Sequence, residues 1–406
     1  MSVPSKKTGP LLLLMVNMFI AMLGIGLIIP ILPDFLKEFG AGGQTAGYLI
    51  AASGLTQFIF SPIVGELSDK YGRKIMIVTG LALFTISQLL FAIAGDVWLL
   101  YVSRLLGGIG GAALIPPMMA FVADITTDED RGKGMGMLGA AMSLGFVVGP
   151  GVGGFLAEVS LRTPLYVSAA VAGAALVLSL IVLPETLTKE RQLAARSMTA
   201  KRQNILKQFA LSAKAPYFVP LILVFTLTLG LMNFEAIFPL YAKESYTFST
   251  KEISVVITIG ALVGTLIQAL LIDKVLRRFG EIKLISASFL AAAVCMVLLL
   301  LSSNFWYVLG ISVLFFIFTA IMRPAINTLL SKMAGNEQGF VAGMNNAYMS
   351  VGNIVGPAIA GNLFDIQINI PYLFGAVILI CGVFLCMAWS ARRTIAVVVP
   401  PAAVQE

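Results

Sequence analysis

The chain has 406 residues, of which 58% are hydrophobic and 12% are charged, and its mean hydropathy is +0.95. A soluble globular domain is nearer a quarter charged, so this composition excludes that class and indicates an integral membrane protein. The chain has no histidine, so any proton chemistry falls to carboxylates. Its three cysteines lie in apolar runs without metal-site spacing, and we expect no metal, disulfide or cofactor.

The first apolar run follows Lys6 and Lys7 and imitates a signal peptide. It is too long for a signal peptide and no small-residue cleavage site follows, so we interpret it as a spanning helix. A span needs about 20 apolar residues. We predict an all-α membrane protein with twelve spans, at residues 11–36, 45–67, 75–95, 98–122, 133–157, 163–183, 217–241, 252–272, 283–302, 305–330, 338–363 and 370–391.

Lysine and arginine are distributed unevenly between the two sides of these spans. With the N-terminus in the cytoplasm, 21 of the 27 basic residues fall on the cytoplasmic side and four outside. This excess predicts cytoplasmic N- and C-termini. It also explains the net charge of +7, because basic loops face anionic lipid, and no nucleic-acid partner is needed.

One long polar segment divides the chain. It predicts two six-helix bundles, at residues 1–183 and 217–392, joined by a cytoplasmic loop at 184–216 that contains a surface helix, with a cytoplasmic tail at 393–406.

The two halves repeat each other. Leu23–Pro33 matches Leu229–Pro239 at an offset of 206, and Gly145–Leu156 matches Gly352–Leu363 at 207. Two parallel six-helix repeats are typical of a rocking secondary transporter, whose substrate site lies between the halves near mid-membrane.

The segment GELSDKYGRK (Gly65–Lys74) joins the second and third spans on the cytoplasmic side. It resembles the signature of the major facilitator superfamily at this position, through Gly65, Leu67, Asp69, Gly72, Arg73 and Lys74. The resemblance implies a cytoplasmic gate. Asp69 can sit at the positive N-terminal end of a helix from the other half, and Arg131 is a possible further partner.

Arg104 opens the run RLLGGIGGAA in the fourth span. The glycines imitate a dinucleotide fingerprint, which we reject because no strand precedes them. An arginine inside a span costs about 2.5–3.5 kcal/mol, so it normally has a partner or a pathway role. The alternative is structural pairing with carbonyl groups of the first span. Arg104 matches the arginine that the family places in its proton-transfer machinery.

The segment GFVVGPGVGGFL (Gly145–Leu156) is similar to the motif of the drug–proton antiporters of this superfamily, through Gly145, Gly149, Pro150, Gly153 and Gly154. Three of these glycines are spaced by four residues and form one smooth face that lets two helices approach closely. Pro150 removes a backbone hydrogen bond. We expect this packing to seal and bend the interface between the halves.

Glu235 lies among Phe234, Phe238 and Leu231 in the seventh span, where its counterpart in the first half is Ile29. Loss of hydration favours the neutral form of such a carboxylate. It can bind a proton or a cationic drug, and this competition is sufficient for exchange. The alternative is a neutral acid that only makes hydrogen bonds.

Met322–Ile326 and Ala334–Asn345 extend the resemblance to the multidrug exporters of Gram-positive bacteria that expel fluoroquinolones and lipophilic cations. The resemblance covers nearly the whole chain. It assigns proton coupling to Glu235, Arg104 and Arg323. The family typically carries an aspartate where this chain has Ala320, so Glu235 is left as the single deep carboxylate.

Adaptable methionine and aromatic side chains, with a few amides, suit promiscuous binding. Besides Glu235, the candidate substrate-binding residues are Asn17, Phe19, Gln57, Met118, Met142, Phe146, Phe234, Phe238, Phe315, Phe316, Asn345, Asn346 and Tyr348. Each of them is also a plausible packing residue.

These features predict a proton-driven exporter of hydrophobic or cationic drugs that works by alternating access. We expect it to be a monomer in the bacterial plasma membrane, with drugs, protons and lipid as partners. One alternative is an exporter of an endogenous lipid, sugar or metabolite. The other is a non-transporting membrane sensor, which predicts loss of the coupling acid. No nucleophile–base pair or nucleotide loop indicates an enzyme.

Overall fold

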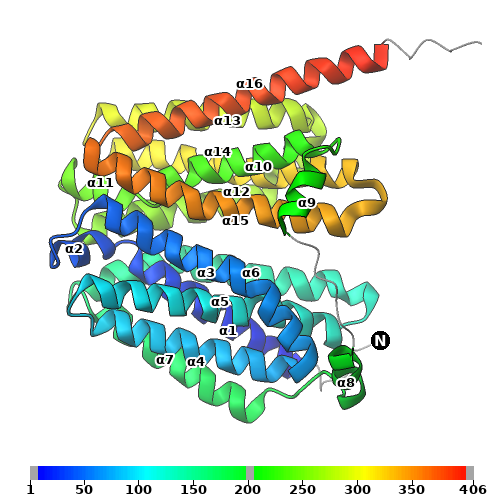
Figure 1. The fold of residues 1–406 in the computed structure, drawn as a ribbon. Coiled ribbons are helices and arrows are strands. Elements are labelled where there is room, and N and C mark those ends of the chain that lie inside the picture. The colour runs from blue at the N-terminus through cyan, green and yellow to red at the C-terminus, as the bar shows by residue number, and fades with distance from the viewer. Residues whose placement is uncertain (1–7, 198–204, 399–406) are drawn as a thin grey trace, which may run out of the picture. The chain divides into compact units, whose positions relative to one another are not determined.

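The computed structural model describes residues 8–197 and 205–398, which are almost entirely helical (Figure 1). Lys6, Lys7 and residues 399–406 of the predicted tail lie outside these residues. Within them, eleven helices are long and apolar enough to cross a membrane. The predicted span that is not among them is the eleventh, at 338–363. It forms α15 (Gln338–Ile366), which is 29 residues long but less apolar, because it contains Asn345, Asn346, Asn353 and Asn362. The predicted all-α membrane fold is confirmed.

The described helices form two compact units. Unit 1 lies within residues 1–202 and 236–258, and unit 2 within 203–235 and 259–406. The unit boundary is therefore not the polar loop alone, because a short piece of the second sequence half packs into unit 1.

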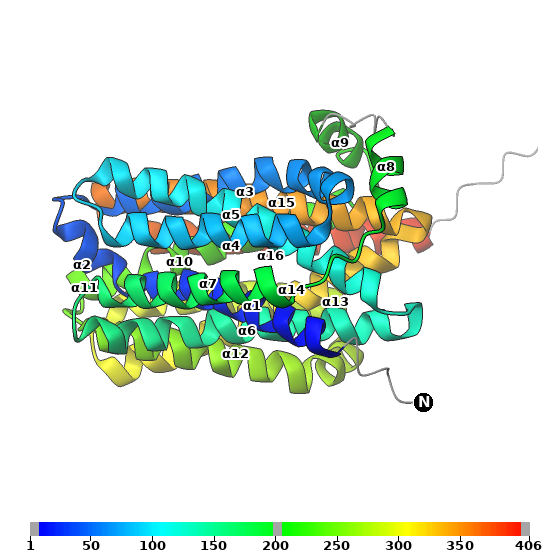
Figure 2. The same ribbon diagram turned by 90° about the horizontal axis from the view of Figure 1, so that it is seen from below.

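The six long helices of unit 1 lie in a row in which each helix packs against the next. The helices of unit 1 are α1 (Thr8–Ile28), α2 (Leu32–Lys37), α3 (Gly43–Tyr71), α4 (Arg73–Ala92), α5 (Val97–Ile125), α6 (Asp128–Ala157), α7 (Thr163–Val182), α8 (Lys189–Ser197), α11 (Phe238–Glu244) and the start of α12 (Thr250–Phe279). Figure 2 shows α3, α5, α4, α7, α1 and α6 in that order, and each packs against the next. Their apolar core includes Met18, Phe84 and Phe121.

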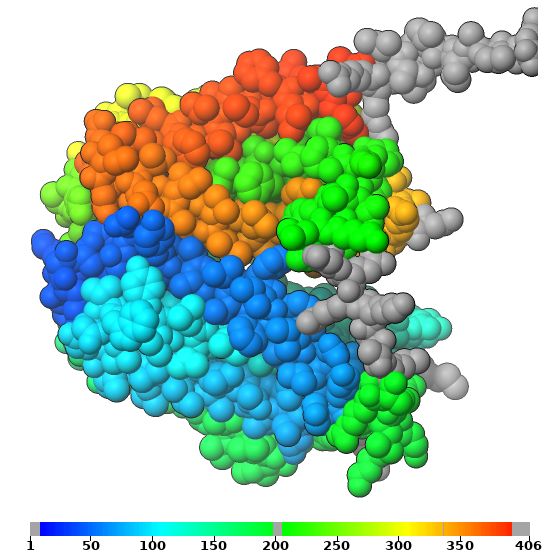
Figure 3. Space-filling view, in the orientation of Figure 1, coloured from blue at the N-terminus to red at the C-terminus, as the bar shows by residue number. Residues whose placement is uncertain are grey.

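In unit 2, two helices, α10 (Phe218–Glu235) and α13 (Glu281–Leu298), make most of the packing contacts with the others. Its other elements are the rest of α12, α9 (Ile205–Ser212), α14 (Phe305–Ala334), α15, α16 (Ile370–Val398) and two 3-10 turns, at Leu299–Leu301 and Gly335–Glu337. α10 (Phe218–Glu235) packs against α14, α15 and α16, and α13 (Glu281–Leu298) packs against α14 and α16. The polar loop thus contains two short helices, α8 and α9, and α9 lies on α15 at the surface (Figure 3).

Two glycines make the sharp junctions between consecutive long helices. Gly72 joins α3 to α4 with φ 110°, and Gly280 joins α12 to α13 with φ 73°. Both values lie in the left-handed region that favours glycine. The two junctions are 208 residues apart, so the repeat extends to the backbone of this turn.

Candidate functional site

Two spans predicted as continuous helices are interrupted at equivalent points of the repeat. α1 ends before α2, and α10 ends before α11. Each short helix has a proline in its first turn, Pro33 or Pro239, which fixes φ and offers no N–H to continue the preceding helix. Glu235 is consequently the last residue of α10, and it lies within the apolar segment Phe218–Glu244, which corresponds to the predicted seventh span.

Glu235 is half-buried at the C-terminal end of α10. The negative end of a helix dipole disfavours a carboxylate and attracts a cation or a proton. Arg323, on α14, is exposed in unit 2 and close enough to interact electrostatically with Glu235. No hydrogen bond or ion pair of the described residues engages the Glu235 carboxylate, so it is available to a ligand.

The aromatic residues beside Glu235 form the core of unit 2. Phe234 stacks on Phe315 with ring centroids 4.3 Å apart and meets Phe316 edge-on at 5.6 Å. Phe234 and Phe315 are fully buried. Phe238, which the sequence places in the same site, is buried in α11 of unit 1.

Ala320 belongs to a close crossing of α12 and α14. A Cβ built on Gly264 would lie 3.0 Å from the Phe316 carbonyl oxygen and 3.5 Å from the Ala320 Cβ. The position where the resembled exporters carry an acid is therefore occupied here by a small side chain in a small-residue contact.

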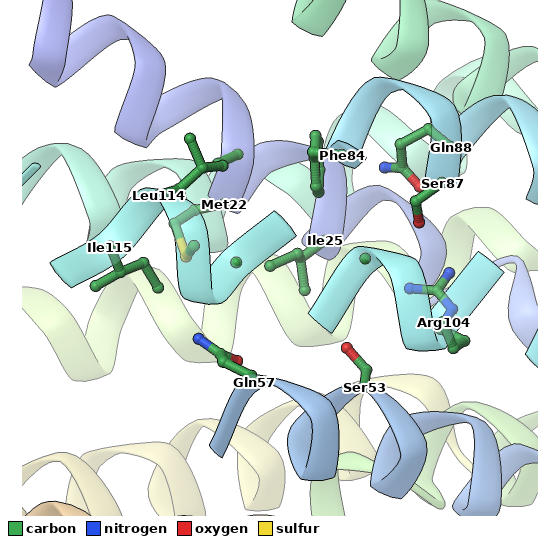
Figure 4. Close-up of a pocket in the computed structure, with 13 residues that line it drawn as sticks. Met22, Ile25, Ser53, Gln57, Phe84, Ser87, Gln88, Arg104, Leu114 and Ile115 are labelled. Atoms are coloured by element: carbon green, nitrogen blue, oxygen red, sulfur yellow. The ribbon is translucent and has the colours of Figure 1, made fainter. Parts of the chain in front are cut away.

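Unit 1 contains a small cavity of about 30 Å³ that is open on one side (Figure 4). Arg104 from α5 and Gln57 from α3 line it, together with Ser53, Ser87 and Gln88. The structure thus brings together two predicted site residues, Arg104 and Gln57. Sequence analysis missed the other three, because serine and glutamine in a span give no signal of their own.

The glycines of α5 explain why this cavity exists. Gly107 and Gly111 line it and present no side chain. Gly108 contacts the backbone of α3 at Ser53, and Gly110 approaches the Phe84 backbone nitrogen of α4. The glycine run therefore lets α5 pack closely between α3 and α4. This packing role agrees with the conclusion that the run is not a nucleotide-binding loop.

The remaining predicted pocket residues do not line this cavity. Asn17 is fully buried and donates to Ser179 Oγ at 2.8 Å, and Met118 is fully buried in the core. Phe19 and Phe146 pack against that core, Met142 and Asn346 are exposed, Asn345 donates to Asn327 at 3.2 Å, and Tyr348 contacts Ser212 and Phe209 of α9.

The segment Gly65–Lys74 forms a charge cluster at the junction of α3 and α4. Asp69 pairs with Arg73 at 2.6 Å, and Arg73 also pairs with Asp124 of α5 at 3.2 Å. Arg131 pairs with Asp128 at 2.8 Å, so the prediction that it is a partner of Asp69 is corrected. Gly65 has open space around it, and nothing in the structure explains it.

Unit 2 carries the same pair with the charges exchanged. Glu281 opens α13 as Arg73 opens α4, and it pairs with Lys332 near the end of α14 as Arg73 pairs with Asp124. Both residues are displaced by the same 208 positions. The corresponding segment of the second half, Asp273–Lys283, keeps little of the sequence of Gly65–Lys74, but the contact is retained.

Glu185, which sequence analysis missed, caps α4. Its carboxylate accepts hydrogen bonds from the backbone N–H groups of Arg73 at 2.9 Å and Lys74 at 3.1 Å. A Cβ on Gly72 would collide with the same carboxylate. The only sequence signal for this capping role is the position of Glu185, which follows Pro184 directly after the sixth predicted span.

The glycines of the antiporter-like motif pack against two different helices. Gly145, Gly149 and Gly153 approach the α1 backbone, and a Cβ on Gly149 would lie 2.8 Å from the Leu23 carbonyl oxygen. This face therefore packs within the first sequence half, so these three glycines do not make the predicted contact with the second half. Gly154 and Gly151 instead face Ser254 and Thr258 of α12, and Pro150 is buried within α6.

Polar contacts at Asp34 also join the two sequence halves inside unit 1. Asp34 of α2 pairs with Lys243 of α11 at 2.9 Å and accepts a hydrogen bond from Thr250 Oγ1 of α12 at 2.7 Å. The Asp34 side chain is 19% exposed, so these contacts are partly shielded from water.

Comparisons with known proteins agree with this architecture. The model of the Major Facilitator Superfamily matches residues 14–277 and 220–405. The chain is 41% identical over 392 residues to multidrug resistance protein 2 of Bacillus subtilis, covering 97% of this chain and 98% of that protein. It is 36% identical over 378 residues to the quinolone resistance protein NorA of Staphylococcus aureus, covering 93% and 95%. The solved structure of the nucleoside transporter NupG matches with a TM-score of 0.74 at 16% identity over 95% of this chain and 99% of that chain, which shows a shared fold.

Proposed function

Because this chain belongs to the major facilitator superfamily, we propose that it is a multidrug efflux transporter that exchanges amphipathic, largely hydrophobic or cationic drugs for protons by alternating access. The names of its relatives support the drug substrates. The observation that carries the proton coupling is Glu235, an unengaged carboxylate at the negative end of α10 and within electrostatic reach of Arg323. By resemblance, Arg104 belongs to the same coupling machinery.

In the proposed cycle, a drug from the cytoplasm or inner leaflet binds while Glu235 is ionised. A proton from outside then neutralises Glu235 and favours release of the drug. Return of the transporter to its first state releases the proton inward. Each ligand thereby biases the two states differently, as alternating access requires. We place the protein as a monomer in the bacterial plasma membrane with both termini in the cytoplasm.

The test is ethidium efflux from everted vesicles with an imposed pH gradient. We expect Glu235→Gln to abolish gradient-driven efflux, because glutamine cannot exchange a proton. The matched control is Glu244→Gln, which removes an exposed acid from the end of α11 and should leave efflux unchanged. Undiminished efflux by Glu235→Gln would refute the coupling role.

A further inference from the structure

The short helix α9 (Ile205–Ser212) has an apolar and basic surface that the fold leaves exposed. Leu206 and Leu211 are 72% and 50% exposed, and Lys207 between them is exposed as well. We propose that α9 is an interfacial helix that binds the anionic phospholipids of the cytoplasmic leaflet, with its leucines among the acyl chains and its lysines at the phosphate groups. This site is separate from the proposed drug and proton sites, and it rests only on the membrane topology proposed above.

The protein itself covers the other side of α9. Phe209 packs on Tyr348 of α15 with ring centroids 4.9 Å apart, and the hydroxyl groups of Ser212 and Tyr348 lie 3.1 Å apart. Lys207 and Leu211 are four residues apart, so they share a side of the helix, and this side points away from α15. α15 therefore holds α9 in place and leaves its apolar and basic side accessible.

The position of α9 along α15 corresponds to the edge of the hydrocarbon layer. Tyr348 lies 18 residues before Ile366, where α15 ends on the proposed outer side. At about 1.5 Å per residue this is about 27 Å, close to the thickness of about 30 Å of a hydrocarbon core. α9 also runs across α15 rather than along it, as a helix in the plane of the membrane does (Figure 1). At this level its side chains reach both acyl chains and headgroups.

The charged residues of the sequence around α9 are all basic. From Arg191 to Lys214 the chain contains six lysine or arginine residues and no aspartate or glutamate. Basic clusters next to a span or on an amphipathic helix attract anionic headgroups. Lys214 lies four residues before Phe218, where α10 begins. Charge and apolar side chains thus select the same partner, an anionic bilayer surface, whereas a soluble anion would leave the leucines in water.

The other short helix of the polar loop provides an internal comparison. α8 contacts the end of α3, where Arg196 donates to the Lys70 carbonyl at 2.9 Å and lies over the Tyr71 ring. Lys70 lies 27 residues from Gly43, the proposed outer end of α3, which corresponds to about 40 Å. This distance exceeds the hydrocarbon thickness by about 10 Å. α8 therefore lies beyond the acyl chains, although its Leu193 is also exposed.

The test places a fluorophore on either helix and a quencher on one lipid at a time. Bimane is attached to Leu211→Cys or Leu193→Cys in the full-length protein carrying Cys295→Ala, Cys381→Ala and Cys386→Ala, with one protein in each nanodisc. Every nanodisc contains equal amounts of phosphatidylglycerol and phosphatidylcholine, and one of the two is brominated on its upper acyl chains. Both leaflets have the same composition, so the result depends neither on the orientation of the protein nor on transport.

We expect lipid bromine to quench bimane at Leu211 and to leave bimane at Leu193 unquenched. Brominated phosphatidylglycerol should quench the Leu211 label about twofold or more strongly than brominated phosphatidylcholine, because the lysines enrich the anionic lipid. No quenching at Leu211, or equal quenching at Leu193, overturns the inference. A Leu211 label that is unquenched but has a blue-shifted emission is covered by protein, which also overturns it. If the Leu211→Cys protein does not fold, Leu206→Cys on the same helix decides by the same criteria.

The charge requirement is tested with the Leu211 label in place. Lys207→Gln combined with Lys214→Gln should make the two brominated lipids quench equally. Lys189→Gln combined with Arg191→Gln removes two exposed charges from α8 instead, and this control should leave the lipid preference unchanged. A preference that survives the loss of both α9 lysines overturns the anionic lipid site. Loss of ethidium efflux with intact quenching would overturn the transport proposal alone.

Discussion

Single glycines on α5 have opposite tolerances for a side chain, although they are neighbours in sequence. A Cβ on Gly108 would collide with the Ser53 carbonyl oxygen and Thr56 Oγ1 of α3, whereas a Cβ on Gly111 would lie 3.5 Å from the Gln57 amide. We expect Gly108→Ala to lower the free energy of unfolding by about 1–3 kcal/mol through overpacking. Gly111→Ala should be neutral or stabilising, because alanine favours a helix.

Thermal unfolding of the two purified variants measures this difference directly. Equal melting temperatures would contradict the packing assigned to Gly108. The sequence predicted a glycine-rich span at this place, but it could not say which glycine faces a neighbouring helix. That depends on the rotation of α5 about its axis, which contacts with α3, such as that of Gly108 with Ser53, determine.

The candidate site shows the same limit at the level of residues. Arg104 and Glu235 stood out because a charge in an apolar run is expensive. Ser53 and Gln88 did not, since an uncharged polar side chain in a span is common and they meet Arg104 only through the packing of α3, α4 and α5.

The N-terminus of α4 carries charges that are unfavourable there, and a carboxylate from the polar loop compensates them. The helix begins with Arg73 and Lys74, whose positive charges oppose the positive end of the helix dipole, and the Glu185 carboxylate binds the exposed N–H groups there. We expect Glu185→Gln to lower the free energy of unfolding by about 1–2 kcal/mol, because the charge is lost.

The control for this prediction is Glu190→Gln, an exposed acid on α8 in the same polar loop. Chemical unfolding monitored by tryptophan fluorescence compares the two variants. If both variants unfold at the same denaturant concentration as the wild type, Glu185 does not stabilise α4.

The positions of the helices could largely be predicted, because about 20 apolar residues satisfy their own backbone hydrogen bonds as a helix in lipid. The interruptions could not. Pro62, Pro150 and Pro324 lie inside long helices, whereas Pro33 and Pro239 follow breaks, and proline alone does not distinguish the two outcomes.

Across the whole molecule, the repeat preserves a contact while exchanging its charges. The side chain of Arg73 is 10% exposed and that of Lys332 is 64% exposed, although they occupy equivalent pairs. We expect Asp124→Asn to cost about 1–3 kcal/mol of unfolding free energy, since the buried Arg73 guanidinium loses one of its two carboxylate partners and keeps Asp69. Lys332→Gln should cost less than about 1 kcal/mol.

The double variant Arg73→Glu with Asp124→Lys copies the arrangement of unit 2 into unit 1. It should recover part of the stability that either substitution loses alone, as measured by a double-mutant cycle of melting temperatures. Recovery stays incomplete because Arg73 also contacts Asp69 and Ser68. Strictly additive losses would show that the two pairs are not equivalent.

The contacts of Asp34 with Lys243 and Thr250 have a consequence for biosynthesis of the protein. These two partners lie 209 and 216 residues later in the chain. At about 5–20 residues per second, a ribosome needs roughly 10–40 s to deliver them. During that interval Asp34, in the first turn of α2, lacks both partners. Completion of unit 1 therefore waits for α11 and the start of α12, and a biosynthetic pause in between prolongs the time for which Asp34 lacks these partners.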